Sequence, residues 1–216
     1  MEYIYTIENN LSSNVCEEII RRFENDDRKH PGLTVGGINK AKKSTDLSIS
    51  DLDEWSDIDK ILYDSLSIGK DEYFEYIKYM LLKNNAFPNL NETFSDMGDT
   101  GYQIQRVRKG EYYDWHEDET NFDEQRFISY IWYLNTLDDD EGGKTLFSNG
   151  KSIRPVCGNL VLFPANWTYF HKGEEVLGKT KYIITGWITR KLLGQHEKNV
   201  FIYNNEKECE SHNSIK

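Results

Sequence analysis

Two histidines and one aspartate have the residue types and spacing of a metal site. His116 and Asp118 are separated by one residue, and His171 follows later in the strand-rich half of the chain. Side chains two positions apart on a strand point to the same side, so the imidazole of His116 and the carboxylate of Asp118 can reach one point. This pair alone also fits an ordinary polar strand edge. His171 would complete a set of three ligands that leaves positions open on a metal ion.

Two histidines and one carboxylate form the ligand set of non-haem Fe(II) oxygenases, whose open positions take a cosubstrate and dioxygen. Ten residues after His171, a lysine opens an apolar segment in which strand alternation puts four residues on one face: Lys181, Ile183, Thr185 and Trp187. A cation held there fits the remote end of a dicarboxylate cosubstrate. The hydroxyls of Tyr133 and Thr185 are candidate helpers.

The second half of the chain has the pattern of short strands separated by turns rich in Gly, Asn and Asp. The expected strands are residues 102–108, 112–117, 126–135, 144–148, 151–154, 158–163, 169–176 and 181–190. Residues 3–7 alternate as a further short strand near the start of the chain. A run of short strands of this kind predicts a sandwich or barrel.

The first half of the chain contains two segments with helical spacing of apolar residues. One helix is expected over residues 11–26, and a second over residues 57–84 with an interruption near Gly69. Residues 30–50 read as loop and irregular strand. Residues 88–101 read as a loop because they are rich in Asn, Asp, Thr and Gly.

Helices first and strands later predict an α+β fold. We expect a double-stranded β-helix (jelly-roll) core with N-terminal helices packed on one face of the sheet. The length of 216 residues suits a single domain over residues 1–216. Within it we expect a helix-rich support region over 1–98, a catalytic core over 99–190 and a polar C-terminal tail over 191–216.

The charge balance disfavours several classes of partner. The chain has 26 Lys and Arg against 37 Asp and Glu, a net charge of -11. This excess works against nucleic acids and anionic membranes as partners. No segment approaches the roughly 20 apolar residues of a membrane-spanning helix. The N-terminal residues lack a signal-peptide pattern, and the three cysteines form no CxxC pair, so a soluble cytoplasmic protein is expected.

Six segments within residues 100–190 together resemble the iron(II)- and 2-oxoglutarate-dependent oxygenases of the prolyl 4-hydroxylase type. Each segment is modest, but all six follow the order of that family with workable spacings. They are Gly110-x-x-Tyr113-x-x-His116-x-Asp118, Ile131-Trp132-Tyr133-Leu134-Asn135, Glu141-Gly142-Gly143-Lys144-Thr145-Leu146-Phe147, Ile153-x-Pro155-x-x-Gly158-x-Leu160-Val161-x-Phe163, His171-x-Gly173 and Lys181-Tyr182-Ile183-Ile184-Thr185-Gly186-Trp187.

The resemblance implies three ligands for Fe(II): His116, Asp118 and His171. It implies that Lys181 pairs with the remote carboxylate of 2-oxoglutarate, helped by the hydroxyls of Tyr133 and Thr185. Trp187 would form a wall of the cosubstrate pocket, and Tyr113 would stand near the metal. The implied cofactors are Fe(II), 2-oxoglutarate as cosubstrate and O2, with ascorbate as a candidate reductant.

The reaction implied by the resemblance is hydroxylation of an unactivated C–H bond, with release of succinate and CO2. A prolyl residue of a protein or peptide is the favoured substrate. Two alternatives stay open. The same chemistry could act on a free amino acid or another peptide side chain, or the chain could be a non-catalytic sensor that binds metal and 2-oxoglutarate. No nucleic-acid or membrane partner is expected, because of the net charge of -11.

The sequence departs from the family pattern at one position. Many members have a tyrosine on the strand before the first histidine ligand, where this chain has Val107. The flanking Arg106 and Arg108 are candidates for contact with an acidic or carboxylate substrate. Residues 1–98 contain no motif that matches the family, and the resemblance implies that this part of the chain shapes substrate choice.

Overall fold

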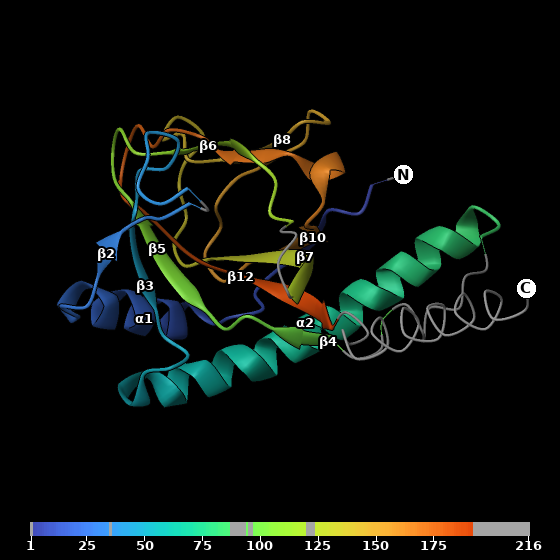
Figure 1. The fold of residues 1–216 in the computed structure, drawn as a ribbon, viewed down its shortest axis with the longest axis horizontal. Helices are drawn as coiled ribbons and strands as arrows, with labels where there is room; N and C mark the ends of the chain where they lie inside the picture. Colours follow the sequence, from blue (N-terminus) through green and yellow to red (C-terminus); the bar gives the residue numbers. More distant parts are fainter. Residues whose placement is uncertain (1, 35, 87–93, 95–96, 120–123, 192–216) are drawn as a thin grey trace, which may run out of the picture.

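The computed structural model has two antiparallel β-sheets facing each other, with helices against the outer side of the larger sheet (Figure 1). It describes residues 2–34, 36–86, 94, 97–119 and 124–191. The fold is α+β with a jelly-roll core, which confirms the fold class expected from the sequence.

The larger sheet has eight strands, and its centre is the long strand β12 (Lys181–Lys191), which pairs with both β7 (Glu124–Tyr133) and β5 (Gln103–Val107). β10 (Leu160–Pro164) and then β1 (Tyr5–Ile7) extend the sheet beyond β7. On the other side of β5 lie β3 (Thr45–Ser48) and β2 (His30–Pro31), and β4 (Met97–Asp99) pairs with the end of β12.

The smaller sheet has four short strands in the order β6, β11, β8, β9. These are β6 (Tyr113–His116), β11 (His171–Gly173), β8 (Thr145–Phe147) and β9 (Ser152–Ile153). A short 3-10 helix, η2 (Trp167–Tyr169), precedes β11.

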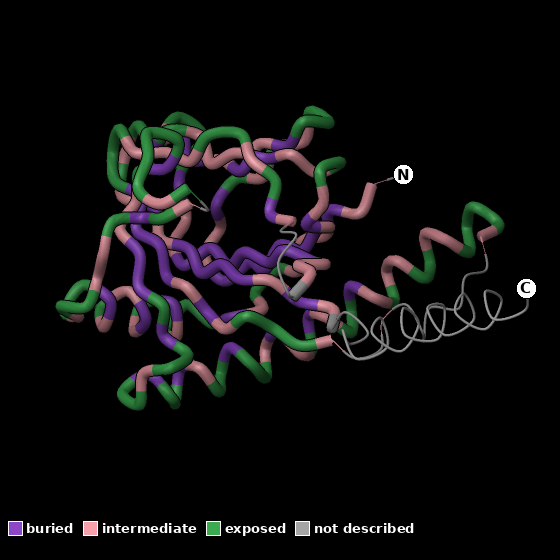
Figure 2. The backbone as a smooth tube through the Cα atoms, in the orientation of Figure 1, coloured by how far each residue is buried: buried purple, intermediate pink, exposed green. Residues whose placement is uncertain are grey.

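Among the residues that the structure describes, two α-helices cover the outer face of the larger sheet (Figure 1). In α1 (Ser13–Asn25), the hydroxyl of Ser12 caps the first turn by accepting a hydrogen bond from the backbone N–H of Val15. The long helix α2 (Ser56–Lys83) follows the 3-10 turn η1 (Asp53–Trp55). Both helices turn apolar residues toward the sheet, as Figure 2 shows by the buried stripe along the start of α2.

The core has two layers because the larger sheet is covered on both faces. On β7, Ile128, Tyr130 and Trp132 belong to the layer between sheet and helices, whereas Ile131 and Tyr133 belong to the layer between the two sheets. This explains why residues 127–133 of β7 are apolar except for Ser129, since a strand covered on both faces needs no polar side.

Helix α2 is continuous, so the interruption expected near Gly69 is wrong. Gly69 is buried where the helix crosses the sheet, and a Cβ atom at this position would lie 2.6 Å from Cδ2 of Leu160. The glycine therefore allows close packing of helix on sheet and does not mark a break.

The segment expected to be a loop contains a strand of the larger sheet, and the segment expected to be loop and irregular strand contains a regular one. Residues 97–99 of the expected loop form β4, and residues 45–48 form the four-residue strand β3. The C-terminal tail over 192–216 lies outside the described residues. Among the helices that the structure describes, none is long and apolar enough to cross a membrane.

Candidate metal centre and adjoining pocket

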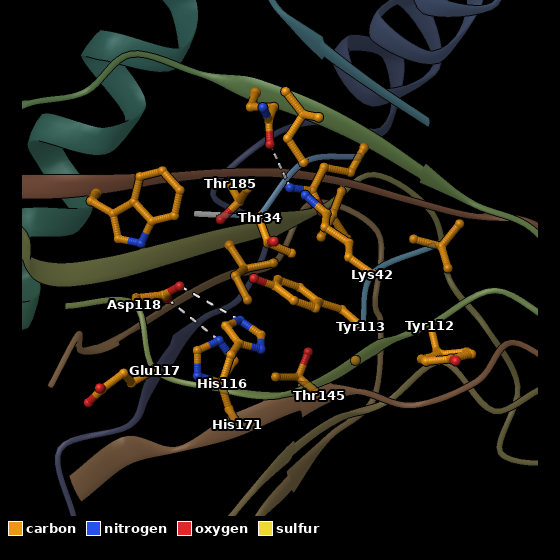
Figure 3. A pocket seen from close by; sticks show the side chains of 18 of the residues that line it. Thr34, Lys42, Tyr112, Tyr113, His116, Glu117, Asp118, Thr145, His171 and Thr185 are labelled. Carbon is orange, nitrogen blue, oxygen red and sulfur yellow. Dashed lines mark hydrogen bonds and ion pairs between the residues drawn. The ribbon is translucent and has the colours of Figure 1, made fainter. Parts of the chain in front are cut away.

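The structure brings the three candidate ligands together on the smaller sheet. His116 is the last residue of β6, His171 is the first residue of β11, and the two are direct partners in the antiparallel ladder. Asp118 follows two residues after His116. The ligand atoms of the three side chains all lie within 4.8 Å of one another (Figure 3).

Backbone carbonyls orient both imidazoles in the same way. Nδ1 of His116 lies 2.8 Å from the carbonyl oxygen of Asp114, and Nδ1 of His171 lies 3.1 Å from that of Tyr169. A ring that donates its Nδ1–H to a carbonyl leaves the Nε2 lone pair free. Both Nε2 atoms face Asp118, at 3.7 Å for His116 and 3.5 Å for His171.

The Asp118 carboxylate is buried and held in place. The Ser129 hydroxyl donates to its Oδ2 at 2.6 Å. Burial would raise the pKa of Asp118, but the neighbouring imidazoles of His171 and His116 and the bond from Ser129 outweigh this and lower it. Burial, reinforced by His171, lowers the pKa of His116 to about 4. A neutral imidazole and an ionised carboxylate are the forms that bind a metal ion, so the set fits a divalent metal with open positions.

Lys181 faces the same pocket from the larger sheet. Its side chain is 3% exposed and makes no hydrogen bond or ion pair with any residue that the structure describes. Burial lowers its pKa to about 8, although nearby Glu174 opposes this shift. An unpaired buried cation is costly, so the position of Lys181 indicates a site for an anion.

The hydroxyls expected near Lys181 have other partners. The Nζ atom of Lys181 lies 5.6 Å from the ring centroid of Tyr133, but the Tyr133 hydroxyl is 2.6 Å from Oγ1 of Thr145. The Thr185 hydroxyl donates to the carbonyl oxygen of Tyr130 at 3.2 Å. Thr145 and Thr185 line the pocket, while Tyr133 lies behind its wall. Thr145 lies in the segment from Glu141 to Phe147 that resembles the family, but the sequence alone gave this residue no role.

Two aromatic residues named from the sequence line the pocket. Tyr113 stacks on the ring of His116 with centroids 3.6 Å apart, and burial raises its pKa to about 12, so its hydroxyl stays protonated at neutral pH. Trp187 also lines the pocket, and the guanidinium of Arg126 lies 3.4 Å from its ring centroid. Sequence reasoning did not identify Arg126.

The pocket has a volume of about 350 Å³ and lies between the two sheets. Besides the residues above, its wall includes three polar side chains that no motif marked: Lys42, Gln103 and Gln105. Lys42 lies in a segment that was read as irregular, so only its position in the fold reveals it.

Arg106 does not line the pocket, which argues against the contact with an acidic substrate for which it was a candidate. It lies between two pocket-lining residues on β5, Gln105 and Val107, and alternation turns it to the helix side. There its guanidinium pairs with Glu24 of α1 at 2.7 Å. Arg108 is exposed and does not line the pocket.

Residues 102–189 match the model of the 2OG-Fe(II) oxygenase superfamily. Three solved prolyl hydroxylases have a similar fold at low sequence identity. The viral collagen prolyl hydroxylase of Paramecium Bursaria Chlorella virus-1, solved with 2OG, has a TM-score of 0.61 and 19% identity over 88% of this chain and 97% of that chain. The Pseudomonas putida prolyl-4-hydroxylase has a TM-score of 0.62 and 18% identity over 89% of this chain and 95% of that chain.

A prolyl hydroxylase from Trichoplax adhaerens, in complex with a peptide fragment of the hypoxia inducible factor oxygen degradation domain, has a TM-score of 0.68. It is 19% identical, and the match covers 86% of this chain and 83% of that chain. No curated protein matches the chain in sequence. These structural likenesses therefore establish the fold.

Proposed function

We propose that the protein is an Fe(II)- and 2-oxoglutarate-dependent dioxygenase acting on a prolyl residue of a protein or peptide, because residues 102–189 match the model of the 2OG-Fe(II) oxygenase superfamily. The reaction hydroxylates an unactivated C–H bond and releases succinate and CO2. The observation that carries the proposal is a buried, unpaired Lys181 facing the same pocket as His116, Asp118 and His171.

Three residues would hold the metal, and the protein fixes each of them before the metal arrives. The carbonyls of Asp114 and Tyr169 orient His116 and His171, and Ser129 orients Asp118. When bound, Fe(II) with 2-oxoglutarate and O2 supplies the oxidising chemistry. The contribution of these side chains is geometry, since ligands that are already aligned need not be ordered on binding.

Lys181 would orient the cosubstrate by pairing with its remote carboxylate. Ile183 and Val107 line the pocket close to Lys181 and keep its surroundings apolar. An ion pair in such surroundings is stronger than in water because the effective dielectric constant is lower. Thr145, whose hydroxyl is bonded to Tyr133, is a second candidate for contact with the cosubstrate.

Support for a prolyl substrate comes from the similar structures, all three of which are prolyl hydroxylases, one of them in complex with a peptide fragment. The stacked pair of Trp187 and Arg126 offers an aromatic face and a cation on the pocket wall. An aromatic face is suited to a proline ring.

The first test is anaerobic. Fe(II) and then 2-oxoglutarate are added to the protein, and the visible charge-transfer absorption of the chelate is measured. We expect the band in the wild type, no band in Asp118→Ala, and in Lys181→Ala a band that needs much more 2-oxoglutarate. A folded wild-type protein with no band, or an Asp118→Ala variant with a normal band, would contradict the assignment.

The second test separates catalysis from sensing. Proline-containing peptides, free proline and other free amino acids are supplied with O2, and succinate release and a product 16 Da heavier are measured. We expect succinate to rise with a prolyl peptide. Formation of the chelate without succinate from any of these compounds would favour a non-catalytic sensor.

A further inference from the structure

Two hydrogen-bonded pairs of polar side chains, Lys42 with Asp46 and Gln105 with Gln103, lie next to each other where β3 and β5 meet the pocket. The Lys42 ammonium donates to Oδ2 of Asp46 at 2.7 Å, and the two side chains are 4% and 0% exposed. Asp46 and Gln105 are direct cross-strand partners, and the Gln105 amide donates to Oε1 of Gln103 at 2.8 Å. Lys42, Gln103 and Gln105 line the pocket, with Asp46 behind Lys42.

This polar group lies away from the anion site at Lys181. Along the ladder between β5 and β12, Val107 is the partner of Lys181, whereas Gln105 is the partner of Ile183. Gln105 is therefore displaced from the Lys181 level by two residues, or about 7 Å at the rise of a strand. This separation leaves Gln105, and Gln103 two residues further along β5, open to a ligand other than one held at Lys181.

The group nevertheless lies next to the metal centre. Nζ of Lys42 is 5.3 Å from the ring centroid of Tyr113, and that ring stacks on His116. Figure 3 shows Tyr113 between Lys42 and the two histidines. A ligand group bound at Lys42 would therefore lie close to the place where a substrate must present its C–H bond.

The buried ion pair of Lys42 and Asp46 is not needed to hold residues 41–43 in place. Backbone hydrogen bonds already join residues 41–43 to β6, from Lys43 N–H to the Tyr112 carbonyl and from Asp114 N–H to the Ala41 carbonyl, both 2.8 Å long. A buried ion pair adds little stability compared with apolar residues of the same size, because both charges lose their hydration. Polar groups that converge on a pocket wall are typical of a ligand site.

The three pocket-lining members of the group, Lys42, Gln103 and Gln105, have more free N–H donors than free acceptor lone pairs, although Oε1 of Gln105 is itself a free acceptor. Asp46 accepts from Lys42 and from the Ser44 hydroxyl, and Oε1 of Gln103 accepts from Gln105. Lys42 keeps two further N–H donors, and each glutamine amide keeps at least one. Exchanging the amide nitrogen and oxygen of both glutamines preserves this excess. The complementary ligand group is an oxygen acceptor.

We propose that Lys42, Gln103 and Gln105 form a substrate subsite that donates hydrogen bonds to the carbonyl or carboxylate oxygen of the prolyl residue being hydroxylated. The inference rests on the proposed function and names the groups that recognise its substrate. A carbonyl oxygen would come from a peptide, and a carboxylate would come from a free amino acid. Asp46 is a positioning residue that holds Lys42 toward the pocket.

The test uses the anaerobic protein loaded with Fe(II) and 2-oxoglutarate. Two probes are titrated, N-acetyl-L-proline, which has a carboxylate, and N-acetyl-L-proline N-methylamide, which has only carbonyls. Binding is followed by the change in the visible band. The variants are Gln105→Leu and Lys42→Met combined with Asp46→Asn, so that no bare carboxylate stays buried. The matched control is Lys43→Met, at an exposed neighbouring lysine.

We expect both variants to bind the preferred probe about tenfold more weakly or worse, as for loss of a charged or buried hydrogen bond. Titration with 2-oxoglutarate and the melting temperature should stay close to wild type, and Lys43→Met should bind the probe normally. Lys42→Arg should bind better than the variant lacking the charge. Tighter binding of N-acetyl-L-proline would indicate a carboxylate as the bound group, and tighter binding of the N-methylamide would indicate a peptide carbonyl.

Three outcomes would overturn the subsite. Folded variants that bind the probes as well as wild type would make the group purely structural. Weakened 2-oxoglutarate binding with unchanged probe binding would assign the group to the cosubstrate. If the wild-type protein forms the band but binds neither probe, the oxygen that the group binds does not belong to a prolyl residue. Each of these leaves the oxygenase assignment standing, whereas absence of the band itself would overturn the proposed function.

Discussion

At the scale of single residues, Lys181 carries a charge whose titration affects both the stability of the protein and its binding of a carboxylate. Its pKa is lowered to about 8 by burial. Unfolding would return it to about 10.4, the ordinary value for lysine. Between these two values the unfolded chain binds more protons than the folded chain, so the stability of the ligand-free protein rises with pH. Binding of a carboxylate requires the protonated form and therefore has the opposite pH dependence.

We predict that the affinity for 2-oxoglutarate falls as the pH rises above about 8, because Lys181 loses its proton there. Lys181→Met should bind 2-oxoglutarate roughly 10- to 100-fold more weakly at neutral pH, the cost of losing a charged hydrogen bond. Its affinity should not change over the same pH range. Anaerobic titrations at several pH values measure both effects, and a pH-independent wild type would assign the anion to another cation.

The sequence singled out the three candidate metal ligands and Lys181, because each lies in a short motif whose strand spacing fixes its direction. The structure places these four side chains around one pocket. Lys42 could not be found in this way. It owes its position to the pairing of β3 with β5 and of residues 41–43 with β6, which are long-range contacts that no local pattern encodes. The sequence left the role of Arg106 open, and only the observed register shows which side of β5 it faces.

At the scale of elements, Gly69 controls how closely α2 approaches the sheet. A Cβ atom there would meet the flexible end of Leu160, which can move to admit one methyl group, but a larger side chain would have to displace the helix. We predict that Gly69→Leu lowers the free energy of unfolding by about 1–3 kcal/mol, the usual cost of overpacking.

Urea denaturation measures this effect, with Asp71→Leu as the control because Asp71 is exposed on the same helix. The control should change stability by less than about 0.5 kcal/mol. Equal effects of the two substitutions would mean that Gly69 is not a packing position.

The strands of the second half were predictable because their alternation and turns are local features. All eight expected strands occur, with bounds that shift by a few residues. The reading of the helical half was weaker. Gly69 resembled a break because glycine disfavours helices, and the sequence does not show that Leu160 packs against it. Short strands such as β3 and β4 lack enough residues for a periodic pattern, and tertiary pairing creates them.

At the scale of the whole molecule, the net charge limits which classes of partner the protein can bind. With a net charge of -11, the protein repels a phosphate backbone. Oxidative repair of nucleic-acid bases is a distinct class of the same chemistry, and it would need a basic surface. We predict no shift of single- or double-stranded DNA at low salt. Binding at micromolar or lower protein concentration would overturn the preference for a peptide substrate.

The candidate metal ligands His116 and His171 belong to the smaller sheet, and Lys181 belongs to the larger one. A metal bound to the histidines and a cosubstrate bound to both the metal and Lys181 would therefore link the smaller sheet to the larger one. Ligand present at one hundred times its dissociation constant stabilises a folded protein by about 2.7 kcal/mol. Protein loaded with metal and 2-oxoglutarate should therefore have a higher melting temperature and resist proteolysis longer than ligand-free protein. In Lys181→Met the metal should still protect, but adding 2-oxoglutarate at the wild-type saturating concentration should add little.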